Sequence, residues 1–252
     1  MALVKRDLAN RFTGSLLGRF WLVLSPLIML GIYAYFFGAV LQAKWSLGPV
    51  QDSLASFAVM IFSGLILHQF FSECITRAPE LVLSNPNYVK KIIFPTEILS
   101  VVALLSTSLQ LLISLLILTV VFAGMSHVLY WTWLYIPLIY LPFMLMTLGI
   151  MWLLASLGVF LRDLRQIVQF VAAALLFLSP VFYPMDRLPE TLQFLKYVNP
   201  LVIVIEQSRL VLFAGVAPEW SVLAAFYGVS FILVAVGYYF FMRSKPAFAD
   251  VI

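Results

Sequence analysis

Charged residues, histidine and cysteine are scarce in this sequence, and each shortage excludes a class of site. Only 10% of the 252 residues are charged, against roughly 25% in an ordinary soluble domain. The single cysteine, Cys74, cannot form a disulfide within the chain, and with only His68 and His127 beside it there is no metal-ligand set. We interpret Cys74 as a small core residue.

Catalytic motifs are absent as well. No GxxxxGK[ST] pattern occurs, so the chain has no phosphate-binding loop with which to hydrolyse ATP by itself. A convergent acid–base set is also missing, because the candidate groups fall on separate segments. These groups are His68, Glu73, Glu97 and Asp163. We therefore predict no catalytic residue and no metal in this chain.

Apolar residues are abundant, at 63% of the sequence. They recur in runs of about 20, each long enough to cross a hydrocarbon core roughly 30 Å thick. We therefore expect one all-α integral membrane domain over residues 1–252. The first run exceeds the length of a signal-peptide core, so we expect it to be an uncleaved span. The predicted spans are 20–40, 56–73, 98–123, 133–160, 167–182 and 222–242.

The basic residues indicate the orientation of these spans. They form short clusters beside apolar runs and no basic stripe, so the formal net charge of +4 does not indicate nucleic acid. With both termini in the cytoplasm, eleven of the fifteen basic residues lie inside, as the positive-inside rule requires. The eleven are Lys5, Arg6, Arg11, Arg19, Arg77, Lys90, Lys91, Arg162, Arg165, Arg243 and Lys245.

Two segments on the predicted cytoplasmic side have helical patterns of their own. In residues 2–16 apolar side chains recur four apart, which fits an amphipathic helix in the membrane interface, although a solvated flank fits equally well. Residues 78–95 form a loop bounded by prolines. Within it, Asn85 and Pro86 resemble a helix N-cap followed by a first-turn proline, so we expect a short helix there.

Residues 183–215 combine apolar composition with prolines and charges, a mixture that a surface loop does not explain. Non-helical backbone at membrane depth persists only where protein or a water-lined cavity satisfies it, so we predict a re-entrant segment on the outer side. Pro189 can begin one short helix, and Asn199 with Pro200 can begin a second. Glu206 and Arg209 lie three apart and can pair on one helical face, either as a structural pin or as a moving latch.

Three blocks of sequence together resemble a known family. They are RDLANRFTGSLLGRFWLVLSPLIMLGIYAYFF, NPNYVKKIIFPTEIL, and RDLRQIVQF followed by LSPVFYP and LPETLQFLKYVNPLVIVIEQSR. The chain resembles the membrane permease of type-2 ABC polysaccharide exporters, and more narrowly the O-antigen, capsule and teichoic acid branch. The resemblance implies a homodimer of six-span subunits in the bacterial inner membrane. It also implies two copies of a separate ATPase subunit, which binds ATP and magnesium, and a glycan substrate carried on a lipid diphosphate.

The resemblance also implies roles for particular residues. The ATPase would contact residues 2–16 and 78–95, and the latter segment includes Pro86, Lys90, Lys91, Phe94 and Pro95. The outer gate would consist of two short helices, 186–198 and 199–213, and its candidate residues are Pro180, Tyr183, Pro184, Asn199, Pro200, Glu206 and Arg209. Sugars stack on aromatic faces, so candidate conduit residues are Tyr33, Tyr35, Phe36, Phe37 and Phe182, for which lipid anchoring is the alternative.

Two other functions fit part of this pattern. A small-lipid or drug exporter of the same superfamily would share six spans and an ATPase partner, although the three blocks favour polysaccharide export. An intramembrane transferase would need the convergent acid–base set that the sequence lacks.

Overall fold

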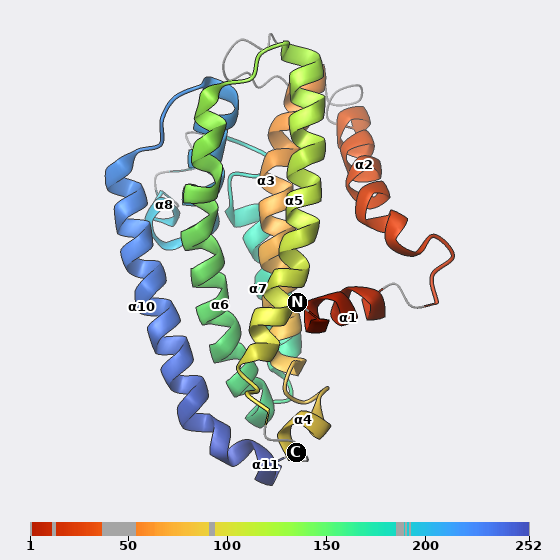
Figure 1. Ribbon diagram of the computed structural model, residues 1–252. Coiled ribbons are helices and arrows are strands. Elements are labelled where there is room, and N and C mark those ends of the chain that lie inside the picture. Colours follow the sequence, from red (N-terminus) through yellow and green to blue (C-terminus); the bar gives the residue numbers. More distant parts are fainter. Residues whose placement is uncertain are drawn as a thin grey trace.

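The computed structural model describes residues 2–11, 14–36, 54–90, 94–184, 189, 191 and 193–251, and in these ranges every regular element is a helix (Figure 1). Lipid offers the backbone no hydrogen-bond partners, whereas in a helix the backbone N–H and C=O groups bond to each other. The longer elements are α1 (Ala2–Arg11), α2 (Trp21–Tyr33), α3 (Leu54–Arg77), α5 (Ile98–Ser126), α6 (Ile136–Phe160), α7 (Leu164–Leu178), α9 (Pro200–Arg209) and α10 (Trp220–Ser244). The shorter ones are η1 (Gly18–Phe20), η3 (Ala78–Glu80), α4 (Pro86–Lys90), η4 (Trp131–Tyr135), α8 (Leu195–Val198), η7 (Leu210–Ala214), η8 (Lys245–Ala247) and α11 (Phe248–Val251).

Each predicted span coincides with an apolar helix, but the helices differ in length. Among the described residues, four are long and apolar enough to cross a bilayer: Phe57–Glu80, Ile98–Ser126, Trp131–Phe160 and Trp220–Ala247. Two are shorter, Trp21–Phe36 and Leu164–Leu178. The last four residues of the predicted span 20–40 lie outside the described residues.

The prediction that the fifth span extends to residue 182 is wrong. Helix α7 ends at Leu178, and Ser179 is extended with φ −109° and ψ 153°. The following Pro180 explains the end, because proline disfavours the α conformation of the residue before it. With 15 residues, α7 is about 22 Å long at the standard helical rise. It is therefore shorter than the hydrocarbon core of a bilayer.

Helices α6 and α10 pack together through two glycines. A Cβ added to Gly237 would lie 2.1 Å from the carbonyl oxygen of Gly149, and one added to Gly149 would lie 2.4 Å from the carbonyl oxygen of Leu233. Small residues permit this close approach of two backbones, which is how helices associate inside a membrane. The two helices lie side by side along most of their length (Figure 1).

Helix α1 lies across the direction of the long helices and packs against α5 (Figure 1). Its apolar residues Val4 and Leu8 are half-buried, whereas Lys5 and Arg6 are exposed. The predicted helix over 2–16 is correct only to Arg11. Gly14 follows with φ +83°, a left-handed conformation that ends helices, and Leu16 is exposed beyond it.

Candidate functional site

The predicted coupling segment contains the expected short helix, α4, which begins at Pro86. Tyr88 of this helix stacks on Phe94, with 4.6 Å between the ring centroids. Pro95 is exposed, and its carbonyl accepts a hydrogen bond from the backbone N–H of Ile98 at the start of α5. Lys90 ends α4, and Lys91 lies outside the described residues.

Helix α1 is joined to this coupling segment by a contact that sequence patterns do not reveal. The guanidinium of Arg6 donates a hydrogen bond to the hydroxyl of Tyr88. The same guanidinium lies 5.6 Å from the centroid of the Tyr88 ring, within the range of a cation–π interaction. The two segments that the family resemblance assigns to the ATPase contact are therefore in direct contact with each other.

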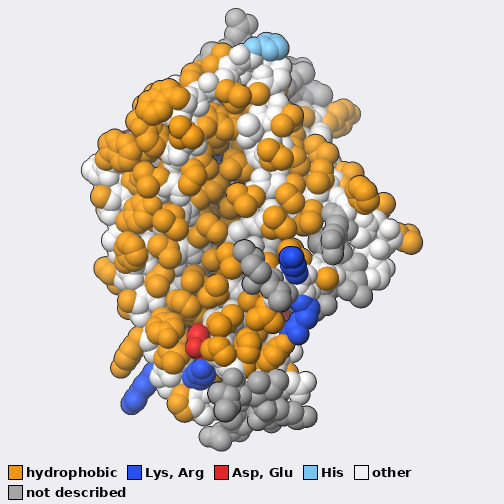
Figure 2. Space-filling model, in the orientation of Figure 1, with side chains coloured by type: hydrophobic (Ala, Val, Ile, Leu, Met, Phe, Trp, Pro, Cys, Tyr) orange, Lys and Arg blue, Asp and Glu red, His pale blue; other side chains and the backbone are white. Residues whose placement is uncertain are grey.

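Three ion pairs link separate segments near the same end of the helix bundle. Arg77 donates to Asp7 across 2.9 Å and joins α3 to α1. Arg165 pairs with Glu80, and Lys245 donates to Glu97 across 2.8 Å. On the face drawn in Figure 2, the Lys and Arg side chains gather around this lower end, and the upper part is largely hydrophobic. The charge distribution is that expected of a membrane-embedded bundle with one basic end.

The predicted re-entrant segment contacts α3 and α6 through its helix α9. Its second helix begins at Pro200 as expected, and Asn199 is its N-cap, with the side chain accepting from the backbone N–H of Leu201 at 3.0 Å. The helix continues beyond Arg209 as one π-helical turn, Leu210–Ala214, and ends at Gly215 with φ +66°.

That Pro189 begins the first short helix stays a prediction, because Glu190 and Leu192 lie outside the described residues. Pro189 itself is not helical, Thr191 lies in a 3-10 turn, and the α-helical part, α8, comprises Leu195–Val198. The described side chains between them, Thr191, Gln193 and Phe194, are exposed, and Leu195 is the first that is buried. A short helix is stable only when packing offsets the cost of nucleation, and that packing begins at Leu195.

Arg209 joins the re-entrant segment to two other parts of the chain, helix α3 and the residues that follow α7. Its side chain is 3% exposed. It donates to the carbonyl oxygens of Pro180 at 2.5 Å, Val181 at 3.1 Å and Met60 at 2.9 Å, and to the hydroxyl of Ser63 at 3.3 Å. The guanidinium thus satisfies the buried non-helical carbonyls of Pro180 and Val181, which would be costly to leave without a donor, and joins them to helix α3 at Met60 and Ser63. Glu206, one turn earlier in α9, interacts electrostatically with this guanidinium.

Gly64 of α3 makes room for this arginine. A Cβ at position 64 would lie 3.1 Å from Nη2 of Arg209 and 3.2 Å from Cα of Val181. Sequence reasoning singled out Arg209 but missed Met60, Ser63 and Gly64. The only signal for them was the presence of small residues in the second predicted span.

Asn199 and Tyr183 donate hydrogen bonds to groups in the last residues of α7 and just after it. The amide of Asn199 donates to the carbonyl of Leu178 at 3.1 Å and to the hydroxyl of Ser179 at 2.9 Å. The hydroxyl of Tyr183 donates to the carbonyl of Phe177 at 2.5 Å. Four of the predicted gate residues, Pro180, Tyr183, Asn199 and Arg209, are therefore brought together around the end of α7. Pro184 is half-buried at the edge of the described segment.

The π-helical turn has partners that the sequence did not indicate. The hydroxyl of Thr132 donates to the carbonyl of Val211 at 2.7 Å, and the indole N–H of Trp133 donates to the carbonyl of Leu212 at 3.1 Å. Sequence patterns placed Trp133 only at the start of the predicted span 133–160. In the structure it also anchors the end of the re-entrant segment.

A cleft of about 410 Å³ lies between α2, α3 and α7. One wall is a polar strip of α3, formed by His68, Gln69, Ser72 and Glu73. Tyr33 of α2 and Leu176 of α7 lie on the other sides. His68 is held in place by donating Nε2–H to the carbonyl of Ala172 in α7 at 2.9 Å, an interhelical hydrogen bond of the kind that joins helices inside membranes.

The structure separates the predicted conduit aromatics. Tyr33 lines the cleft, whereas Tyr35 and Phe36 are exposed at the end of the same helix. Phe182 packs near Phe177, with ring centroids 6.2 Å apart, beyond the end of α7. Phe37 lies outside the described residues.

Comparison with known proteins identifies the family. The profile described as ABC-2 type transporter matches residues 1–213. The chain belongs to the ABC-2 type transporter family. It is therefore the transmembrane, non-catalytic permease of an ABC transporter, in which a separate subunit binds ATP.

Full-length similarity extends to permeases of this family with known cargo. The chain is 26% identical to the O-antigen export system permease protein RfbA of Klebsiella pneumoniae, over 100% of this chain and 94% of the relative. It is 24% identical to the RfbA protein of Myxococcus xanthus, over 99% of this chain and 94% of the relative. It is also 25% identical to the polysialic acid transport protein KpsM of Escherichia coli, over 86% and 82% of the two chains.

Proposed function

We propose that this ABC-2 permease exports a lipid-linked polysaccharide of the O-antigen type across the bacterial inner membrane. The observation that carries this proposal is the cleft beside α3, where Gln69, Ser72 and Glu73 present polar groups at membrane depth. Polar residues in a bilayer are costly and mark the pathways of polar substrates. A glycan matches this lining through its hydroxyls, and Tyr33 offers a face on which a sugar can stack.

The cleft also supports the proposal of a homodimer. Gln69 is exposed on one subunit, although it belongs to an apolar helix long enough to cross the membrane. An amide facing lipid is unfavourable, and a second copy packed against this face would enclose it in a shared conduit. Exposed apolar side chains of α2 and α7 flank the cleft and would form that contact; they include Ile28, Ile32, Phe170 and Phe177.

The remaining parts of the proposal concern topology and coupling. Six spans with both termini cytoplasmic place the basic end of the bundle inside and the re-entrant segment outside. ATP-driven closure of the partner subunits would then push on α4 and α1 and move the spans beneath the gate. Any such movement requires that the ATPase contact this surface differently in its two states.

The proposal is tested in a bacterium that assembles its polysaccharide on a lipid diphosphate and lacks its own permease. This chain, expressed with its ATPase subunit, should restore surface polysaccharide and clear the lipid-linked glycan that accumulates inside. Gln69→Leu should reduce export severalfold at unchanged protein level, and Leu109→Ile on the exposed surface of α5 is the matched control.

If drugs or small lipids are exported and the glycan stays inside, the alternative exporter function is correct. If no partner ATPase copurifies with the chain and export fails, the hypothesis that this chain is part of an exporter is wrong.

A further inference from the structure

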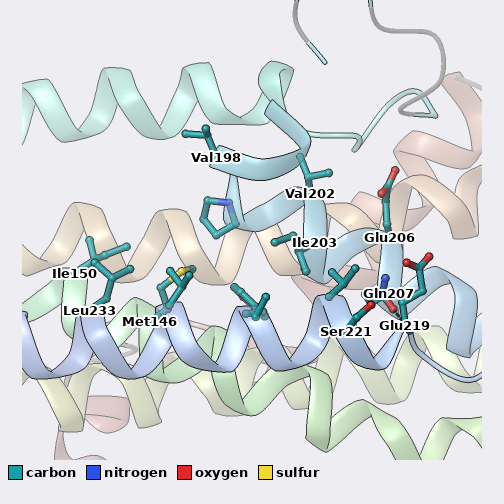
Figure 3. A pocket seen from close by; sticks show the side chains of 15 residues that line it. Met146, Ile150, Val198, Val202, Ile203, Glu206, Gln207, Glu219, Ser221 and Leu233 are labelled. Atoms are coloured by element: carbon teal, nitrogen blue, oxygen red, sulfur yellow. Dashed lines mark hydrogen bonds between the residues drawn. The ribbon is translucent and has the colours of Figure 1, made fainter. Parts of the chain in front are cut away.

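A second and larger cavity lies on the other side of the re-entrant segment, between α9, α6 and α10. Its volume is about 740 Å³, within the range of roughly 300–1,000 Å³ that small-molecule sites occupy. It shares no lining residue with the cleft beside α3. Its two ends differ in chemistry, as Figure 3 shows: Ile150, Met146 and Leu233 lie toward one end, and Glu206, Gln207 and Glu219 lie at the other.

The apolar part has the character of an acyl-chain groove. Its walls are apolar side chains from four helices, among them Val198 of α8, Ile203 of α9, Met146 of α6 and Val229 of α10. Ala225 of α10 is exposed in its floor, so the groove opens at the surface of the bundle. A groove of this kind in a membrane protein is in contact with lipid.

The polar end carries negative charge. Glu206 and Glu219 both line it, and no lysine or arginine is among the lining residues of the described chain. Arg209 compensates Glu206 electrostatically from behind α9, where its guanidinium is bound to the carbonyls of Pro180 and Val181. Glu219 is exposed, and its backbone N–H donates to the side-chain oxygen of Gln207 at 2.8 Å, which orders this end of the groove.

The depth of the polar end matches that of lipid headgroups. Trp220 follows Glu219 directly and packs edge-on against Tyr135, with ring centroids 5.4 Å apart. Tyr135 in turn packs against Trp131 at 5.3 Å, and both tryptophans are exposed. Clusters of tryptophan and tyrosine mark the boundary between hydrocarbon and headgroups, so Glu219 lies at the level of the headgroups.

We propose that this groove is a binding site for a glycerophospholipid with an ammonium headgroup, such as phosphatidylethanolamine. One acyl chain lies along α10, and the ammonium donates to the carboxylates at the polar end. Selectivity comes from the headgroup, because an acyl chain gains little by leaving bulk lipid for an equally apolar groove. The bound lipid supports α9 through the groove-lining residues Val202, Ile203 and Glu206, and Arg209 is not among the lining residues. The proposal does not depend on which substrate the permease exports.

Native mass spectrometry of the full-length purified chain, titrated with phosphatidylethanolamine or phosphatidylglycerol of identical acyl chains, tests this site. We expect phosphatidylethanolamine to bind more tightly, and Glu219→Gln to weaken it on the order of tenfold because a charge-assisted hydrogen bond is lost. Ala225→Phe should block the groove, and Ala224→Phe, exposed on the same helix but outside the groove, should bind as wild type does. Asp163→Asn, an exposed carboxylate outside the groove, is the control for charge.

Other results would overturn the assignment. Equal binding of the two lipids, or undiminished binding by both Glu219→Gln and Ala225→Phe, would show that the groove does not select an ammonium headgroup. Tighter binding of a polyprenyl diphosphate than of phosphatidylethanolamine, lost in Ala225→Phe, would assign the groove to the carrier lipid instead. Because binding is measured without the ATPase or the glycan, failure here leaves the proposed export function untouched.

Discussion

The guanidinium of Arg6 in α1 is bound to the phenol of Tyr88 in α4, both through a hydrogen bond to the hydroxyl and by its position 5.6 Å from the ring centroid. The two residues are 82 positions apart in sequence. Tyr88 also stacks on Phe94, so α1, α4 and the residues before α5 form one connected surface. A force applied by a partner to any of these segments reaches the other two.

Replacing Tyr88 with Leu should therefore reduce export while ATP hydrolysis by the partner subunit continues. The contact is worth only about 0.5–1 kcal/mol at an exposed site, so the melting temperature should change by no more than about 4 °C. Lys5→Gln is the control for a change at an exposed position of α1. Export and hydrolysis falling in parallel would indicate a loss of assembly rather than of coupling.

Phe94 and Pro95 provide a second test of the same surface. Phe94→Ala removes the ring that stacks on Tyr88, and Pro95→Ala changes an exposed position before α5. Either change should uncouple ATP hydrolysis from export and leave the permease folded, as judged by size-exclusion chromatography. Unchanged export in both variants would remove these residues from the coupling surface.

The charges of α9 are predicted to stabilise the outer gate. Glu206→Ala deprives the buried guanidinium of Arg209 of its electrostatic partner, and Arg209→Met removes the donor that Pro180 and Val181 share. Because breaking a buried charged network costs about 3–5 kcal/mol, the Arg209 change should be the more severe. The measurements are ion leak in reconstituted vesicles and the fraction of dimer. Arg243→Met, at an exposed position of α10, should behave as wild type.

If both Glu206→Ala and Arg209→Met keep the vesicles tight and the protein dimeric, the two charges have no role in the gate. Leak without loss of the dimer would favour a moving latch, whereas loss of the dimer without leak would favour a structural pin.

Two glycines of α10 provide a test of the close approach to α6. Gly237→Ala places a Cβ about 2.1 Å from a backbone oxygen and should destabilise the protein by about 1–3 kcal/mol through overpacking. Gly228→Ala meets no atom within 4 Å, so it should be neutral or stabilise the helix by up to about 1 kcal/mol. Thermal unfolding in detergent distinguishes the two, and equal melting temperatures would contradict the packing described here.

Much of the fold could be predicted because it depends on local chemistry. In the described part of the chain, the apolar runs predicted the positions of the four long and two shorter apolar helices, since a bilayer requires spans of a certain length. Asn199 and Pro200 predicted the start of α9, because capping and a first-turn proline act within a few residues. The distribution of lysine and arginine anticipated one basic end of the bundle, where Arg77, Arg165 and Lys245 form ion pairs.

The sequence by itself therefore determined that this protein is a membrane bundle interrupted by a proline-bearing segment near its last span. Tertiary structure decided which segments lie around the end of α7, which carbonyls Arg209 satisfies, and that α1 contacts α4 through Arg6 and Tyr88. The physical reason is the range of the interactions. Helical periodicity and capping act between residues a few positions apart, whereas the carbonyls to which Arg209 donates lie 28 to 149 positions away from it. Only packing brings those segments together.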